Sequence, residues 1–359
     1  FLQGGTAANA FARVQEARFR GVTANPATAN RTIMDPTYRS PVVEQFSFQL
    51  QRELARDYAL SVGWIGTKGT GLFQTVDANP IIPFSSPARR VNPFVGTVRN
   101  RCNCSSSIYH SLQISLDKRL SRSFSAGAHF TWSSFIDDAS ELFNPNPLSD
   151  VAVAQNSFDR RSDRARSSFD RPKRFTMNAV YEVPFMRGQR QWYAKVLGGW
   201  QVSPFMTFQS GAPFTVLNGA DPGGVLAGIS GMVGNAIRPN LNTSLDVSRM
   251  KLTDVFVAQQ AARAAGNPLW RQVTAAAPWG DSGRNILRAD GIGNVDLGLM
   301  KNTSITEKVR LQLRCDMFNM TNTRNFGTPD GRVNSAGFLN QWNTDGGRRR
   351  IQVSARITF

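Results

Sequence analysis

The sequence predicts an all-β fold, in which antiparallel strands cross a membrane and close into a β-barrel. Three observations support this prediction. Segments of about ten residues alternate apolar and polar side chains, and a tilted membrane strand needs about that length. The links between these segments are short and long in turn, as they are in transmembrane barrels. No run of about 18 apolar residues is present, so a transmembrane helix is excluded.

The alternation predicts nine strands, because each segment is bounded by turn-forming residues. They lie at residues 45–53, 58–66, 109–120, 124–135, 174–185, 200–209, 294–301, 309–319 and 350–359. The apolar rows begin with Phe46, Phe48 and Leu50, continue through Leu112, Ile114 and Leu116 and through Phe175, Met177 and Ala179, and end with Ile351, Val353, Ala355, Ile357 and Phe359. We expect these rows to face lipid and the alternate polar residues to face the barrel lumen.

The links and the start of the chain predict how the barrel is organised. The longest link, roughly residues 218–293, contains a helical pattern at residues 254–266. Bacterial single-chain barrels have an even number of strands, so at least one further strand is expected upstream or within residues 1–42. The chain opens on Phe1 without a signal-peptide pattern, and we expect it to be part of a longer precursor. Residues 1–42 are predicted to be an extracellular loop or partial strand, and residues 43–359 a C-terminal barrel portion.

Aromatic residues near the strand ends indicate where the membrane interfaces lie. Tyr58, Trp64, Phe124, Trp132, Tyr181 and Phe185 all fall on apolar faces, as aromatic girdles do in membrane barrels. The alternative is a soluble all-β binding module with these residues in its core. Strands of about ten residues are longer than the five or six that are usual in soluble sheets, which favours the membrane barrel.

Composition adds little about partners. The net charge is +17 and the isoelectric point about 10.9, but the arginines are dispersed, and those at residues 157–174 alternate with aspartates. We therefore expect no nucleic-acid binding. Cys102 and Cys104 have only His110 nearby, which is too few ligands for zinc, so two loop thiols or a local disulfide are expected. No segment has the spacing of a calcium loop, and no metal or cofactor is expected.

Several segments resemble the C-terminal barrel half of TonB-dependent outer-membrane receptors, most closely the Oar-like subgroup, which carries a carboxypeptidase-regulatory-like domain at its N-terminus. The similar stretches include "YHSLQISLDKRLSRSFSAGAHFTWSSFID", "FDRPKRFTMNAVYEVPF", "LGGWQVSPFMTFQSGAPFTV" and "VRLQLRCDMFNMTNTRNFGTP", in the family's order over residues 108–359. The resemblance implies a barrel of roughly 22 strands closed by a plug, in the outer membrane of Gram-negative bacteria. It also implies import of a substrate, with TonB engaged through an N-terminal region missing here. Outer-membrane lipid, lipopolysaccharide and the barrel-assembly machinery are the other implied partners. The machinery would read the terminal strand ending in Phe359 as its signal.

The predicted lumen face supplies the candidate substrate-binding residues: Glu182, Arg310, Gln312, Arg314 and Asp316. Arginine costs about 2–4 kcal/mol on the lipid face at mid-depth, so these side chains should point inward. There they would contact an anionic substrate, or form a ladder that faces solvent or the plug. Arginines between Arg160 and Arg174 would contact lipopolysaccharide phosphates, or be held by ion pairs within the loop.

Two other functions stay open on the sequence. A plugless porin or adhesion barrel would show the same strands. An outer-membrane hydrolase could use His129, which lies on a predicted lumen face with Ser125, Thr131 and Ser133 on its own strand. Residues of one strand do not assemble a catalytic triad, and no Gly-x-Ser-x-Gly motif is present. We therefore expect no enzymatic activity and no catalytic residue.

Overall fold

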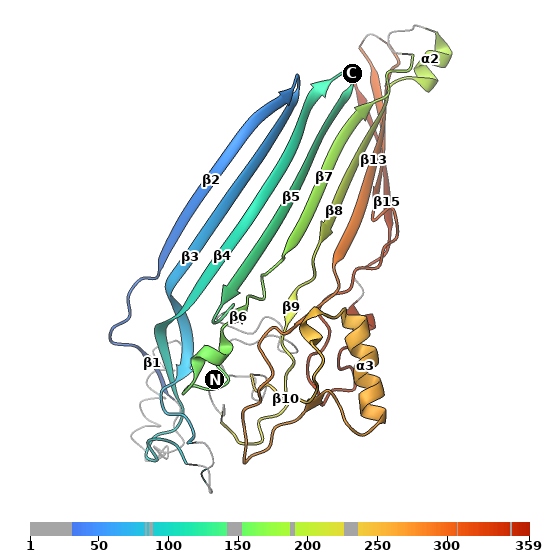
Figure 1. Ribbon diagram of the computed structural model, residues 1–359. Coiled ribbons are helices and arrows are strands. Elements are labelled where there is room, and N and C mark those ends of the chain that lie inside the picture. The colour runs from blue at the N-terminus through green and yellow to red at the C-terminus, as the bar shows by residue number, and fades with distance from the viewer. Residues whose placement is uncertain are drawn as a thin grey trace, which may run out of the picture.

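The computed structural model describes residues 31–82, 85, 89–141, 153–186, 191–225, 236–306, 308–344 and 347–359. All nine predicted strands are present, and each pairs antiparallel with the next along the chain (Figure 1). They are β2 (Val42–Ala55), β3 (Tyr58–Asp77), β4 (Val98–Ser121), β5 (Phe124–Asp137), β7 (Lys173–Glu182), β8 (Trp200–Gln209), β13 (Ile292–Ser304), β14 (Arg310–Phe318) and β15 (Arg350–Thr358). The strands β2 and β15 are the two edges of this sheet.

The sheet has a turn end and a loop end, as Figure 1 shows. At the turn end, β2 joins β3 and β4 joins β5 through two residues each. Arg122 and Ser123 both have positive φ, the geometry that two-residue hairpins favour. The helix α2 (Trp192–Leu197) lies at this end, and β15 also finishes there. The four longest links lie at the loop end, so the predicted alternation of link lengths is confirmed, except that the link between β7 and β8 at the turn end spans residues 183–199.

The strands β3 and β4 are much longer than predicted, with 20 and 24 residues. Their extra residues, 67–77 and 98–108, are rich in Gly, Thr, Ser and Asn and have no regular apolar alternation. They pair with each other beyond the regular sheet, with register shifts around Leu72. A pattern search misses them because this extension lacks the lipid-facing row that produces the period of two.

On one face of the sheet, the register mostly places apolar residues opposite apolar residues. One row, Trp64–Leu112–Trp132, crosses β3, β4 and β5, and another row, Leu299–Cys315–Val353, crosses β13, β14 and β15. These side chains are solvent-accessible: Val353 is 74% exposed and Phe48 is 61% exposed. An apolar surface of this extent is foreign to soluble monomers and suits a lipid-facing wall.

The loop end carries smaller elements. Strand β1 (Arg31–Met34) pairs parallel with β4, and β6 (Ala165–Arg166) pairs with β5. Two separate pairs are β9 (Pro213–Phe214) with β12 (Leu287–Arg288) and β10 (Asn240–Leu241) with β11 (Trp270–Arg271). The helices are α3 (Leu252–Ala264) and the short η1 (Arg160–Asp163), η2 (Val247–Arg249) and η3 (Gln341–Thr344). The predicted helix at residues 254–266 is confirmed as α3. The extra barrel strand expected in residues 1–42 is not found in residues 31–42, where β1 is short and parallel; residues 1–30 lie outside the described residues.

The buried apolar core lies in these links and not in the sheet. Residues 153–172, 210–225, 236–291 and 323–342 form what we call the loop-end cap. One core cluster is built from residues such as Phe214, Trp270 and Phe338, and a second from Leu217 and Ile237. In the described part of the chain, no helix is both long and apolar enough to cross a bilayer. Cys102 and Cys104 form a disulfide, which lies in β4 and not in a loop as expected.

Candidate functional site

The face of the sheet opposite the apolar rows is mainly polar. The row Gln51–Ser61–Ser115–His129–Thr176–Thr207 crosses six strands. The row Asn302–Gln312–Arg356 crosses the last three. We call this surface the lumen face. Its side chains alternate with the lipid-facing ones because successive residues of a strand point to opposite sides.

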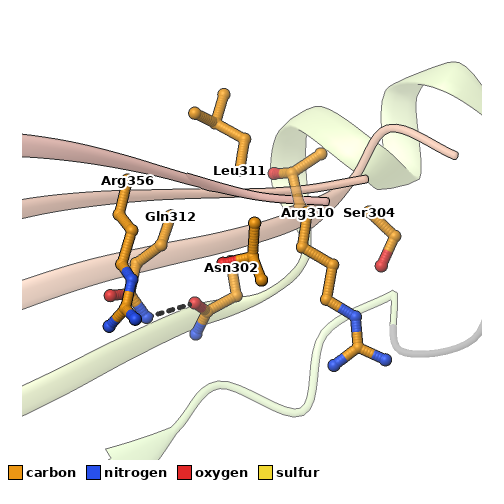
Figure 2. A pocket seen from close by; sticks show the side chains of 8 residues that line it. Asn302, Ser304, Arg310, Leu311, Gln312 and Arg356 are labelled. Atoms are coloured by element: carbon orange, nitrogen blue, oxygen red, sulfur yellow. Dashed lines mark hydrogen bonds between the residues drawn. The ribbon is translucent and has the colours of Figure 1, made fainter. Parts of the chain in front are cut away.

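A groove of about 320 Å³ lies on the lumen face across β13, β14 and β15, near the turn end. Figure 2 shows Arg310, Gln312, Arg356 and Asn302 on one side of the strands and Leu311 on the other. The amide of Gln312 donates to Asn302 Oδ1 at 2.9 Å. Neither the Arg310 nor the Arg356 side chain has an ion pair or hydrogen bond within the described part of the chain. The groove therefore concentrates two positive charges, and among the described residues nothing occupies their guanidinium donors. Such a site suits a carboxylate or phosphate.

The candidate residues Arg314 and Asp316 pair with each other. Arg314 Nε lies 2.7 Å from Asp316 Oδ2, so much of their charge is neutralised locally. Gly298 faces Asp316 on β13, and a Cβ at this glycine would lie 3.2 Å from Asp316 Oδ1. The missing side chain leaves room for the carboxylate to reach Arg314. This pair separates the groove from the rest of the lumen face.

The candidate Glu182 lies in the same row as Arg314 but does not contact it. The row runs from Glu182 through Gln201 and Met300 to Arg314. Three strand spacings of about 4.8 Å separate the two ends, or roughly 14 Å. The structure thus brings Arg310 and Gln312 together with Arg356 and Asn302, and leaves Glu182 at a distance. The sequence placed Arg356 on the lumen face but gave no register between β14 and β15, because residues 319–349 separate them.

The terminal strand has the expected two faces. Ile351, Val353, Ala355 and Ile357 stand opposite Met317, Cys315, Leu313 and Leu311 on β14. The four side chains of β15 are exposed, and Phe359 follows the strand at 97% exposure.

His129 lies on the lumen face, with Nε2 at 3.8 Å from Asp117 Oδ1. Both side chains are about half exposed. Ser115 is directly opposite His129 in the register, yet no serine hydroxyl of the described residues bonds to the imidazole. A base and an orienting carboxylate are therefore adjacent, without the hydrogen-bonded nucleophile that a triad requires.

Buried ion pairs join segments within the loop-end cap and connect the cap to the sheet. Arg238 bonds to Asp163, and Arg284 bonds to Asp137 at the end of β5; all four side chains are at most 3% exposed. Asp170 Oδ2 forms an ion pair with Arg288 at 2.7 Å. The other carboxylate oxygen, Oδ1, accepts a hydrogen bond from the backbone N–H of Phe135 in β5 at 2.9 Å. Asp163 and Asp170 of the arginine-rich stretch therefore pair with arginines from other segments. Of the arginines in the stretch itself, Arg166 pairs with Asp170 within the loop and Arg164 pairs with Asp138.

The environment of Asp163 perturbs its protonation. Burial raises the pKa of Asp163, while the charge and hydrogen bond of Arg238 act in the opposite direction. Asp163 Oδ2 has no hydrogen-bond partner among the described residues, so desolvation of the charged form is only partly compensated. Nearer the surface, hydrogen bonds from Arg332 and Ser335 lower the pKa of Asp330 against the effect of burial.

The cap contains an apolar pocket of about 220 Å³ beside α3. It is lined by Phe256, Val257, Phe326, Leu339 and Trp342, with Thr253, Asp290, Asn340 and Gln341 at its polar edge. The Phe326 and Trp342 rings meet edge to face at 5.5 Å. The sequence gave no sign of this site, because its residues come from four separate segments without periodicity. Within the described ranges, no group of three or more His, Cys, Asp or Glu side chains could hold a metal ion.

Comparisons with known proteins identify the family. Solved structures with a similar fold include the outer membrane transporter YddB from Escherichia coli (10% identity, TM-score 0.45), the FrpB iron transporter from Neisseria meningitidis (8%, 0.41) and the ferripyoverdine receptor from Pseudomonas aeruginosa (11%, 0.41). They cover 92%, 91% and 88% of this chain, which spans only 34%, 32% and 27% of theirs. No curated protein matches the sequence. Residues 3–352 match the family described as "Outer membrane beta barrel domain", so the chain belongs to this family and resides in the bacterial outer membrane.

Proposed function

We propose that the protein is a TonB-dependent outer-membrane receptor that captures a substrate at the cell surface and imports it through the barrel. In this proposal, residues 43–359 form the C-terminal portion of a barrel of roughly 22 strands. A plug, the first strands and the segment that contacts TonB belong to sequence outside this chain. The subgroup we propose is the Oar-like one, which the sequence stretches over residues 108–359 resemble. The turn end is then periplasmic and the loop end extracellular.

The observation that carries the proposal is a folded cap above a polar, cationic wall. The cap has its own apolar clusters and buried ion pairs, which is more structure than connecting loops need. Its apolar pocket is a suitable place for the first contact with a small ligand. At the other end of the sheet, the groove with Arg310, Gln312 and Arg356 offers two guanidinium groups without partners among the described residues to an anionic group of the substrate or to carboxylates of the plug.

The site residues follow from this arrangement. Arg310 and Gln312 bind the anionic group, Arg314 and Asp316 hold each other in place, and Glu182 lines the lumen at the periplasmic end. The row from Ile351 to Phe359 presents the signal for barrel assembly. Lipopolysaccharide surrounds the outer leaflet.

The proposal is tested on the full-length protein in planar lipid bilayers and in cells. A plugged receptor gives no steady ion conductance, and photo-crosslinkers placed near its N-terminus form an adduct with TonB in cells. A stable conductance without a TonB adduct would instead identify a plugless porin, the second candidate. An adhesion barrel would show neither conductance nor an adduct.

Two further candidates have less support. A soluble binding module would have to expose Phe48, Leu50 and Val353 to water at 61–74% exposure, which an isolated soluble sheet avoids. A hydrolase would use the neighbouring His129 and Asp117, but it needs a nucleophile that the described lumen face does not present to the imidazole.

A further inference from the structure

The helix α2 differs from the other connections at the turn end. Two of those connections are two-residue turns, and the link between β13 and β14 is only residues 305–309. The link between β7 and β8 spans residues 183–199 and contains α2. A six-residue helix is too short to be stable alone. Its position must therefore come from contacts with the sheet.

Contacts with β13 place α2 on the lipid-facing side of the sheet. Lys301 and Thr303 stand opposite Leu313 and Leu311 in the register, so both belong to the apolar face. The Lys301 ammonium donates to Lys195 O at 2.7 Å and also to Gly198 O. Figure 2 agrees: the helix lies on the Leu311 side of the strands, away from the groove.

These hydrogen bonds also explain how a lysine sits on an apolar face. Lys301 is 8% exposed, and its ammonium lies 5.7 Å from the centre of the Trp200 ring. The carbonyls at the end of α2 supply acceptors that lipid lacks. Lys118, also on the apolar face and close to a turn, shows the same arrangement: its ammonium donates to Ser121 Oγ and Phe124 O and lies over the Tyr58 ring. Both lysines have the environment of side chains at a membrane interface.

The outward surface of α2 is apolar although nothing in the described chain covers it. Trp192, Val196 and Leu197 are 77%, 57% and 50% exposed, while Ala194 is 4% exposed and faces the protein. Trp192 and Val196 are one helical turn apart and share a face. These side chains continue the lipid-facing surface of β8, whose first residue, Trp200, is also exposed.

We propose that α2 is an interfacial anchor, lying at the boundary between headgroups and acyl chains of the leaflet at the turn end. Its occupant is glycerophospholipid, the lipid of the periplasmic leaflet under the proposed orientation. Trp192, Val196 and Leu197 enter the acyl region, and Lys195 and Lys301 lie at the level of the phosphates. Short amphipathic helices bind membranes in this way. The anchor fixes the depth of the barrel in the membrane. The inference rests on membership of the outer-membrane barrel family and on the geometry of α2, and it does not depend on whether the protein imports a substrate.

The test uses the folded protein in bilayers of phosphatidylcholine with and without bromine on the acyl chains. The emission of Trp192 is obtained as the difference between the wild-type protein and Trp192→Phe. We expect brominated lipid to quench most of this difference and aqueous iodide to quench little of it. Trp342, in the loop-end cap, is the matched control: its difference emission should respond to iodide and not to bromine.

Each other result overturns the proposal. Quenching of Trp192 by iodide and not by bromine means that α2 projects into water. Protection from both quenchers means that a protein surface, such as a second copy of the chain, covers the helix. Lys301→Met provides an independent measurement, because it removes the bonds to Lys195 O and Gly198 O. Trp192 in this variant should lose much of its bromine quenching, while heat-modifiable migration confirms that the sheet is still folded.

Discussion

The buried pair of Arg238 and Asp163 gives the sharpest test of how the loop-end cap is stabilised. Arg238 also donates from Nε to Ser282 O at 2.7 Å, and its backbone N–H donates to Gln155 Oε1 at 2.7 Å. Arg238→Met keeps an unbranched apolar stem but leaves the Asp163 carboxylate buried without its counter-charge. Removing one partner of a buried pair costs about 3–5 kcal/mol.

The assay is hydrogen exchange at amides of the cap. The Asn218 N–H bonds to Ile237 O at 2.7 Å, beside Arg238, and therefore reports opening of this region. A loss of about 3–5 kcal/mol corresponds to exchange faster by roughly two to three and a half powers of ten. Arg249→Met is the matched control, because Arg249 pairs with Asp246 at the surface and is 87% exposed; surface pairs contribute about 0–1 kcal/mol.

A pH series checks the cause. Burial raises the folded-state pKa of Asp163 above its unfolded value of about 3.9, so through this group the cap gains stability as the pH falls. Loss of Arg238 raises that pKa further. The deficit of Arg238→Met should therefore be largest above the folded-state pKa of Asp163 in the variant, and it should shrink as the pH falls to the folded-state pKa of Asp163 in the wild type.

Asp163→Asn in the Arg238→Met background should recover part of the deficit at neutral pH, because no uncompensated charge remains. A deficit no larger than that of Arg249→Met would refute the reasoning, as would a deficit that does not change with pH.

Four other predictions concern the remaining sites. The double variant Arg310→Gln and Arg356→Gln should weaken binding of an anionic substrate or of the plug and make that binding less sensitive to salt. Arg314→Gln should have a smaller effect, because Asp316 already neutralises Arg314. Binding titrations at two ionic strengths check this prediction, and equal effects of the two variants would contradict it. Phe359→Ala should slow barrel insertion, so that the unfolded form, whose migration does not change on heating, accumulates. Thr358→Ala, on the lumen face, should not have this effect. His129→Ala should leave any ester hydrolysis by the purified protein unchanged, and a loss of hydrolysis would revive the enzyme hypothesis. Trp342→Ala should reduce capture of ligand by cells without changing the amount of folded barrel, and unchanged capture would exclude the cap pocket.

The membrane sheet was predictable because its environment imposes a period on the sequence. Lipid on one side and water on the other force alternation, so rows such as Ile351, Val353 and Ile357 are readable without knowledge of the partner strand. The extension of β3 and β4 was missed where that constraint ends. Lys301 was placed within a predicted strand, but its bonds to α2 were not readable, because the helix has only one and a half turns and no periodic signal.

The cap and the groove depend on contacts between distant segments, which no local pattern encodes. Arg238 and Asp163 are separated by 75 residues, and Arg284 and Asp137 by 147. The apolar residues that form the cap core, such as Phe214, Ile237 and Trp270, occur singly or in short groups without a regular period. Gln312 and Arg356 meet only because β15 returns to β14 after a long link. The sequence therefore indicated which face these two residues occupy and gave no indication that they are neighbours.

The protein is thus stabilised in two different ways, and the predictions separate them. In the sheet, apolar side chains face outward and gain their stability from lipid, while the backbone hydrogen bonds of adjacent strands satisfy each other. In the cap, apolar side chains face inward and the gain comes from leaving water, with buried ion pairs at the contact between the two parts. Arg238→Met should therefore open the cap while heat-modifiable migration of the sheet stays unchanged. Phe359→Ala should impair assembly of the sheet while the Asn218 amide of correctly inserted molecules exchanges as in the wild type. If either variant affected both measurements equally, the cap and the sheet would form one cooperative unit, and Arg284 with Asp137 would be the pair to replace next, because it joins them directly.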